Sequence, residues 1–104
     1  MSYMRKADAN QPAIVKVLRS AGCTVEHLHA VGKGCPDLLC AIDGQVFLIE
    51  VKDGAKDASK QKLTADQIVW HKDWKAEVHI VNSTEAAIAV VGKYRTKPPL
   101  KEAP

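Results

Sequence analysis

Apolar residues near the N-terminus recur with the spacing of a helix. Positions i, i+3, i+4 and i+7 of one segment are all apolar, and they are occupied by Ile14, Val17, Leu18 and Ala21. This stripe is typical of an amphipathic helix. Pro12 suits its first turn, with Asn10 or Gln11 as the candidate cap, and Gly22 marks the expected end.

Extended segments are expected in the middle of the chain. Residues 23–31 alternate apolar and polar side chains imperfectly, which favours a short strand. Residues 37–42 and 45–51 are two apolar runs joined by Asp43-Gly44, a strong signal for a two-residue hairpin. The pattern therefore predicts up to three strands, two of them in one hairpin.

The second half of the chain predicts a helix, a strand and a helix. Thr64 and Gln67 have the spacing of a capping box, so a helix should begin there. A short strand is expected over 77–81. A final helix should follow over "STEAAIAVVG", capped by Asn82 or Ser83 and stopped by Gly92.

The elements follow the order α, β, β, β, α, β, α, which predicts an α/β fold with a mixed sheet flanked by helices. The strand at 45–51, the next helix and the strand at 77–81 form a βαβ crossover, so these two strands should be parallel. We expect one domain over 10–92, after a polar arm at 1–9 and before a basic, proline-containing tail at 93–104.

Composition narrows the class of protein. The chain has 104 residues, 46% of them hydrophobic, and a net charge of +3, which suits one small domain and is compatible with nucleic acid. An odd number of cysteines without a CxxC pair predicts no disulfide framework. The N-terminus shows no signal peptide, and no apolar run approaches the ~20 residues that span a bilayer. We expect a cytoplasmic protein with no membrane partner.

Charged residues interrupt the apolar hairpin. Glu50 and Lys52 are two positions apart on one strand and should project to the same face. Counting outward from the turn, with Ile42 opposite Gln45, places Asp37 opposite Glu50. Facing carboxylates repel unless a cation lies between them, and Mg²⁺ prefers such oxygen ligands. A metal beside a lysine provides the groups for phosphodiester hydrolysis, so these residues are candidates for a catalytic site. The alternative interpretation is that Glu50 and Lys52 form a simple ion pair at the end of a strand.

Three motifs carry a family resemblance. Asp37, preceded by proline, is followed thirteen positions later by "EVK", which resembles the PD-(D/E)xK nuclease signature. The segments "GKGCPDLL", "IEVKDG" and "LTADQIVWH" resemble the VRR-NUC group, small virus-type replication-repair nucleases of phage and prophage. The resemblance covers roughly residues 10–91.

The resemblance implies a restriction-endonuclease-like core of αβββαβ order and a role for each matching residue. Asp37 and Glu50 would be metal ligands for Mg²⁺ or Mn²⁺, with the Val51 backbone carbonyl as a third. Lys52 would be the catalytic lysine and Gln67 an auxiliary catalytic residue, although the capping box alone also accounts for Gln67. No small-molecule cofactor is implied.

The first helix departs from the family pattern. Many relatives place a Glu there, whereas this chain has Gln11 or Ala13 at the corresponding place, which makes Gln11 a possible auxiliary residue. Fewer acids leave two functions open. One is a divalent-metal-dependent endodeoxyribonuclease that cuts duplex or branched, Holliday-junction-like DNA. The other is a non-catalytic nucleic-acid-binding module that keeps the fold.

Several further residues have two interpretations each. The lysines outside the motif cores are either solvated or in contact with DNA phosphates, and the candidates are Lys33, Lys56, Lys60 and Lys62. Basic residues of the tail, Lys93, Arg95 and Lys97, are expected to flank the same site. Trp70 and Trp74 suit core packing or a dimer surface more than base stacking. Relatives imply a homodimer acting on DNA, possibly four-way junctions, in a bacterial or phage-infected cell.

Overall fold

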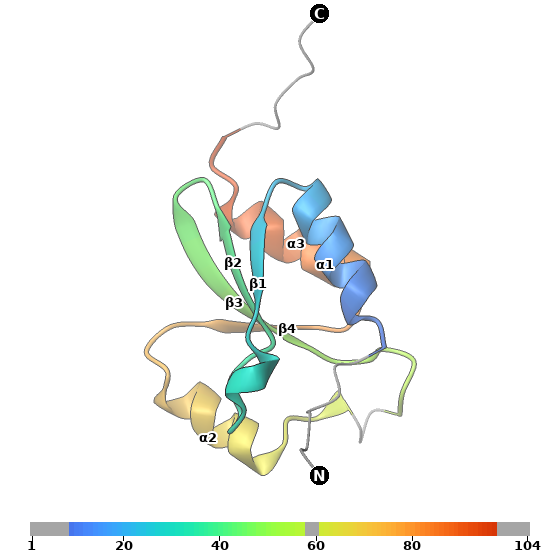
Figure 1. The fold of residues 1–104 in the computed structure, drawn as a ribbon, viewed down its shortest axis with the longest axis vertical. Coiled ribbons are helices and arrows are strands. Elements are labelled where there is room, and N and C mark those ends of the chain that lie inside the picture. The colour runs from blue at the N-terminus through green and yellow to red at the C-terminus, as the bar shows by residue number, and fades with distance from the viewer. Residues whose placement is uncertain (1–8, 58–60, 98–104) are drawn as a thin grey trace, which may run out of the picture.

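Three helices and one four-stranded sheet form most of the protein that the computed structural model describes, which is residues 9–57 and 61–97. Figure 1 shows the arrangement. The elements are α1 (Gln11–Ser20), β1 (Thr24–His27), the 3-10 helix η1 (His29–Val31), β2 (Leu38–Ile42), β3 (Gln45–Val51), α2 (Ala65–Asp73), β4 (Val78–Val81) and α3 (Thr84–Tyr94).

The sheet is mixed, as the sequence predicts. Its strands lie in the order β1-β2-β3-β4, with β1 and β2 antiparallel, β2 and β3 antiparallel, and β3 and β4 parallel. Ile42 is opposite Gln45, and positive φ angles at Asp43 (51°) and Gly44 (79°) form the tight turn between them. The predicted hairpin, its register and the βαβ crossover are therefore confirmed.

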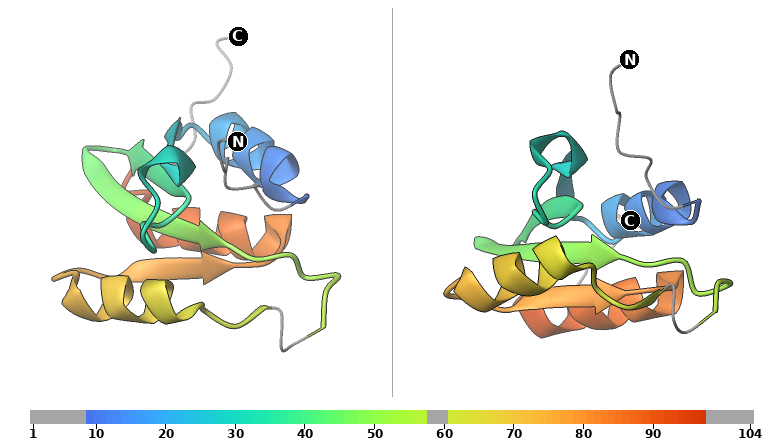
Figure 2. Two further views of the ribbon diagram at one scale, coloured as in Figure 1. Left: turned by 60° about the horizontal axis from the view of Figure 1, so that its bottom comes forward. Right: turned by 90° about the horizontal axis from the view of Figure 1, so that it is seen from below.

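The hydrophobic core lies between one face of the sheet and the pair α1 and α3. Helix α1 contributes Ile14, Val15 and Leu18, and α3 contributes Ala87, Val90 and Val91, all buried. These side chains meet alternate residues of the strands, including Cys40, Ile49 and Val51. Figure 2 shows α1 and α3 beside the sheet and α2 placed away from them.

The two ends of the sheet differ in what covers them. At one end β2 begins and β3 finishes, and α2 lies there at the bottom of Figure 1; we call this the α2 end. The β2–β3 turn marks the opposite end, the hairpin end. The Asp43 carboxylate there accepts hydrogen bonds from the backbone N–H groups of Thr96 (2.8 Å) and Lys97 (3.0 Å).

Three predictions about elements need correction. Helix α3 continues through Gly92 to Tyr94 because Tyr94 is held by stacking on Phe47, with ring centroids 4.4 Å apart. This contact outweighs the roughly 1 kcal/mol that glycine costs in a helix.

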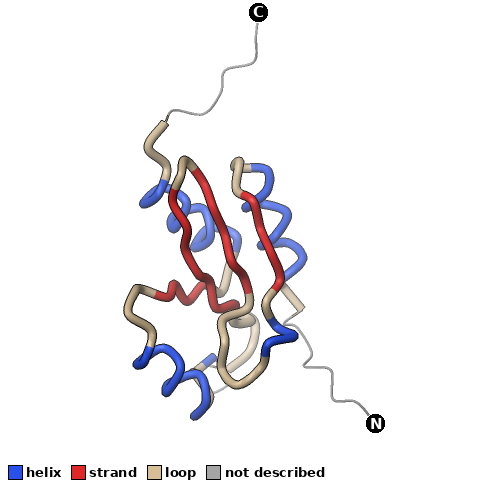
Figure 3. The backbone as a smooth tube through the Cα atoms, turned by 60° about the vertical axis from the view of Figure 1, so that its left-hand side comes forward, coloured by secondary structure: helices blue, strands red, loops and turns tan. Residues whose placement is uncertain are grey.

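The segment 23–31 is only partly a strand: β1 ends at His27 and η1 follows, as the short helical turn in Figure 3 shows. Of the expected tail residues, Lys93 belongs to α3, and Arg95 and Lys97 follow at the hairpin end, far from α2.

Within the ranges that the structure describes, no helix has both the length and the apolar character needed to cross a membrane.

Candidate active site

Glu50 and Lys52 lie on the same face of β3 at the α2 end, as their spacing predicts. Their neighbours Ile49 and Val51 point into the core on the other face and are fully buried. Glu50 is only 1% exposed and Lys52 only 8% exposed. Two charges are thus held in a protein interior, where an unpaired charge is costly.

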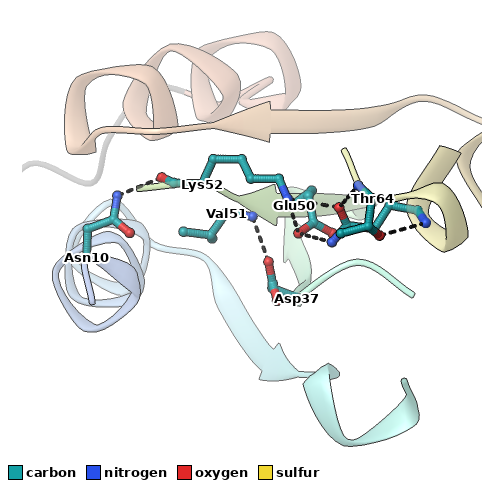
Figure 4. A network of polar contacts seen from close by, with 7 residues as sticks. Asn10, Asp37, Glu50, Val51, Lys52 and Thr64 are labelled. Carbon is teal, nitrogen blue, oxygen red and sulfur yellow. Dashed lines mark hydrogen bonds and ion pairs between the residues drawn. The ribbon is translucent and has the colours of Figure 1, made fainter. Parts of the chain in front are cut away.

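Gln67 joins these two charges through its side-chain amide. Figure 4 shows how Glu50, Lys52 and Thr64 lie in this network. The Lys52 ammonium donates to Gln67 Oε1 at 2.8 Å, and Gln67 Nε2 donates to Glu50 Oε2 at 3.0 Å. Direct approach of Lys52 Nζ to Glu50 Oε2 is longer, at 3.9 Å. The amide therefore holds the ammonium and the carboxylate in fixed positions.

The same glutamine also caps α2. Gln67 Oε1 accepts from the Thr64 backbone N–H at 2.9 Å, and Thr64 Oγ1 accepts from the Gln67 backbone N–H at 3.2 Å. Both bonds of the predicted capping box are present. Capping and contact with Glu50 and Lys52 are thus combined in one side chain, so the two interpretations do not compete.

Asp37 lies just before β2, beside the end of β3. The β2–β3 register ends at Leu38 opposite Ile49, so its continuation places Asp37 opposite Glu50. The Asp37 carboxylate accepts a hydrogen bond from the Val51 backbone N–H at 2.8 Å. On the other edge of β3, the Lys52 N–H donates to the Val81 carbonyl of β4. Asp37 therefore replaces a backbone acceptor where the β2 ladder ends.

The oxygen donors here suit a hard divalent cation. In an extended strand the N–H and C=O of one residue point the same way, so the Val51 carbonyl lies on the side of Asp37. Two carboxylates and a carbonyl match the donor set of Mg²⁺, which commonly uses one or two carboxylates and completes its shell with water. The described residues hold no cluster of three histidine, cysteine or acidic side chains that could bind a metal. The donor set thus fits Mg²⁺ better than a tightly enclosed transition metal.

Helix α1 reaches the same end of the sheet through its first residues. Asn10 Nδ2 donates to the Lys52 carbonyl at 2.9 Å and to the Asn82 carbonyl at 3.2 Å. Asn10 is the N-cap residue of α1, but its side chain therefore makes no cap hydrogen bond to that helix. Gln11 is 2% exposed and its Nε2 lies 3.3 Å from His27 Nδ1. The structure thus places the Gln11 amide beside His27.

His71 is a residue whose position the sequence did not predict. It lies one turn after Gln67 and reads as a solvated helix residue in the sequence. Burial first, and then the positive charge of Lys52, lower the pKa of His71. Its Nε2 is buried and finds no hydrogen-bond partner in the described ranges. The i+4 spacing from Gln67 was the only available signal.

The glycine loop before β2 supports α2. Gly34 has φ +85°, and a Cβ added there would lie 2.3 Å from the Asp66 carbonyl oxygen. Only glycine allows the loop to approach the first turn of α2 so closely. Lys33 is exposed beside it and lines a groove with Asp66 and Asp73. The loop therefore helps to position Gln67.

The remaining residues that the sequence singles out do not gather around Glu50 and Lys52. Lys56 and Lys62 are exposed in the segment between β3 and α2, and Lys60 lies outside the described residues.

Trp70 and Trp74 stack, with centroids 4.9 Å apart, and line an apolar groove with Leu39 and Leu48. His27 and His29 belong to different elements, β1 and η1. All three cysteines are buried, and no disulfide links any of them in the described part of the chain.

Comparison with known proteins identifies the fold. No family model and no curated protein matches the sequence. Among solved structures, the chain is similar to a VRR_NUC domain, with a TM-score of 0.63 and 24% sequence identity over 82% of this chain and 92% of that one. The chain therefore has the restriction-endonuclease-like fold of a VRR_NUC domain, as its motifs imply.

Proposed function

We propose that this chain is a divalent-metal-dependent endodeoxyribonuclease that hydrolyses phosphodiester bonds in duplex or branched DNA. The observation that carries the proposal is the buried Glu50–Gln67–Lys52 network beside Asp37, at the end of a sheet with a VRR_NUC fold. Buried charges are expensive to keep, and they concentrate at functional sites.

The residues that would hold Mg²⁺ or Mn²⁺ are Asp37, Glu50 and the Val51 carbonyl. When bound there, the cation would polarise a phosphoryl oxygen and lower the pKa of an associated water. One carboxylate oxygen of Asp37 accepts a hydrogen bond from the Val51 N–H. The other carboxylate oxygen of Asp37 would therefore bind the cation.

Lys52 would supply positive charge to the reacting phosphate. Its ammonium has three donors, and one of them is used by Gln67 Oε1. The other donors can orient an attacking water or offset the charge that develops on the phosphate oxygens. Gln67 would act by holding that ammonium in place, because its own oxygen also accepts from Thr64.

The finer parts of the proposal concern substrate and assembly. A four-way junction is the candidate branched substrate, a 5′-phosphate is the expected product end, and a homodimer would provide one site per strand. Lys33, Lys56, Lys60 and Lys62 are proposed to contact DNA phosphates around the site. The substrate, product and assembly assignments follow from the resemblance to the VRR-NUC group, whereas the lysine assignments follow from basic residues that flank the motifs in the sequence.

A non-catalytic nucleic-acid-binding module is the second candidate. Two observations favour it: α1 brings Gln11 in place of an acid, and the Gln67 amide already pairs with both Glu50 and Lys52. In this alternative the network would be a structural remnant, and the fold would bind DNA without cutting it.

A substrate panel separates the two candidates. Purified protein is incubated with labelled linear, nicked, flap and four-way DNA, with Mg²⁺ or Mn²⁺ and then with EDTA. The nuclease proposal predicts cleavage of at least one substrate that EDTA abolishes. Retained binding without cleavage under every metal condition would favour the binding module.

A further inference from the structure

A groove between α1 and the segment β1–η1 is not used by the candidate active site. It has a volume of about 570 Å³, and its lining includes Val15, Lys16 and Arg19 from α1 together with His27 and His29. Arg19 is four residues after Val15 and three after Lys16, so both lie on the same side of the helix as Arg19. At 1.5 Å per residue the ten residues of α1 border about 14 Å of this groove.

The charge of the groove has one sign. Lys16 and Arg19 are exposed, and two imidazoles face them across the groove. None of the residues that the structure assigns to its lining is acidic. By contrast, the groove beside Lys33 also contains Asp66 and Asp73. The groove along α1 is therefore complementary to an anionic ligand.

The lining also contains polar atoms without partners in the described structure. Gln11 is 2% exposed, and its Oε1 makes no hydrogen bond there. His29 Nδ1, on the opposite wall, is likewise buried without a partner. Because amide and imidazole groups both donate and accept, these two side chains suit a ligand that carries polar groups as well as charge.

The groove begins next to the candidate active site. Gln11, at its start, follows Asn10, whose side chain bonds to the Lys52 carbonyl. His27, on the other wall, precedes Leu28, whose N–H donates to the Asp37 carbonyl at 2.8 Å. The groove therefore begins one residue away from Asn10 and Leu28, which contact the backbone carbonyls of Lys52 and Asp37.

We propose that the groove binds one strand of nucleic acid adjacent to the scissile phosphate, with its phosphates on Lys16 and Arg19 and its polar edges on Gln11 and His29. The axial length of α1 corresponds to about four phosphates at the ~3.4 Å spacing of one duplex strand. This inference rests on the proposed function for its substrate class, and it adds a binding surface outside the catalytic residues.

The test measures binding without cleavage. A fluorescently labelled oligothymidylate is titrated with protein in EDTA at several salt concentrations, and log Kobs is plotted against log salt. Each phosphate contact to a single strand contributes about 0.7 to the slope. Lys16→Ala should lower the magnitude of the slope by about 0.7, and Lys16→Ala with Arg19→Gln by about 1.4.

Lys93→Ala is the matched control. Lys93 is an exposed lysine near the end of α3, at the hairpin end, so the same charge change there should leave the slope unaltered. Gln11→Leu removes no charge and should weaken binding roughly threefold to tenfold at one salt concentration without changing the slope. If Gln11→Leu does not fold, Lys16→Ala still tests whether the groove binds nucleic acid, because Lys16 is exposed and its replacement should not disturb the fold.

Three results would overturn the proposal: no binding of the oligothymidylate by the unaltered protein, an unchanged slope in both Lys16 variants, or an equal change in Lys93→Ala. The outcome is separable from that of the substrate panel. A Lys16-dependent slope in a protein that cuts no DNA would keep the groove and reject the nuclease. Metal-dependent cutting with an unchanged slope would reject the groove alone.

Discussion

The α2 end and the hairpin end of the sheet use polar side chains in opposite ways. At the α2 end, Glu50, Lys52 and Gln67 are buried and bond mainly to one another. At the hairpin end, Asp43 lies near the surface and its carboxylate accepts from the backbone of Thr96 and Lys97. Hydrogen bonds from backbone N–H groups to a surface carboxylate stabilise the fold with little desolvation penalty. A buried ion pair seldom adds net stability, because removing both charges from water costs about as much as their attraction returns. The difference is what the proposed function requires, with polar groups at the α2 end serving the site and those at the hairpin end serving stability.

Replacing the buried charges by apolar side chains is the strongest test of this contrast. We expect Glu50→Leu with Lys52→Met to leave stability unchanged or to raise it by about 1–4 kcal/mol, as found for buried ion pairs generally, while cleavage is lost. Chemical denaturation and the nuclease assay measure the two effects. The control is Glu77→Gln, which removes an exposed partner of His79 and should change stability by less than about 1 kcal/mol. A large loss of stability in the double variant would show that the charges are structural.

The glycine loop tests how α2 is held at its end of the sheet. Gly34→Ala should destabilise the protein by about 1–3 kcal/mol more than Gly32→Ala, because its Cβ would overlap the Asp66 backbone. Gly32 is the matched control: its φ is also positive, at +72°, but no atom lies within 4 Å of an added Cβ. Thermal or urea unfolding measures both variants. Equal losses would mean that the approach of the loop to α2 is unimportant.

The amide of Gln67 should contribute about as much stability as the loop contact. Gln67→Leu leaves the Thr64 N–H and the Lys52 ammonium without their acceptor, which we expect to cost about 1–3 kcal/mol. A double-mutant cycle with Lys52→Met isolates the pair, and a coupling free energy of about 0.5–3 kcal/mol is expected. A coupling near zero would show that Gln67 acts only as the helix cap.

The smallest effect is expected at the hairpin end and depends on pH. The backbone N–H groups of Lys97, and then of Thr96, lower the pKa of Asp43 below its ordinary 3.8. The stabilisation is therefore fully present above about pH 3.8 and is lost as pH falls through the lower folded-state pKa. The melting temperature of Asp43→Asn should lie below that of the unaltered protein at neutral pH, and the two should converge in acid. Cleavage should be the same in both, and a change in cleavage would link the two ends.

Local sequence signals predicted the parts of the molecule that short-range chemistry determines. Asp43-Gly44 specified the hairpin, and counting from that turn gave the register that brings Asp37 opposite Glu50. Thr64 and Gln67 specified the start of α2. Each of these features depends on residues within a few positions of one another, so periodicity and turn chemistry were sufficient.

The parts that the sequence did not reveal depend on contacts between distant segments. Asn10 is the N-cap of α1, as the sequence suggests, but its side chain makes no cap bond and donates to the carbonyls of Lys52 and Asn82. Gly92 reads as a helix end, yet Phe47 and Tyr94 stack and extend α3 past it. The groove along α1 also arises only when separate elements pack together, so no local pattern could predict it.

Cleavage by the unaltered protein and by Lys52→Met, compared side by side on the same labelled four-way and linear DNA in Mg²⁺, tests the central claim most directly. We predict cleavage by the unaltered protein that EDTA abolishes. The rate should fall on the order of 100-fold to 1000-fold in Lys52→Met, as when one charge-stabilising donor is removed, while DNA binding is largely kept. Equal cleavage by both proteins would contradict the role of Lys52, and cleavage by neither would contradict the nuclease itself.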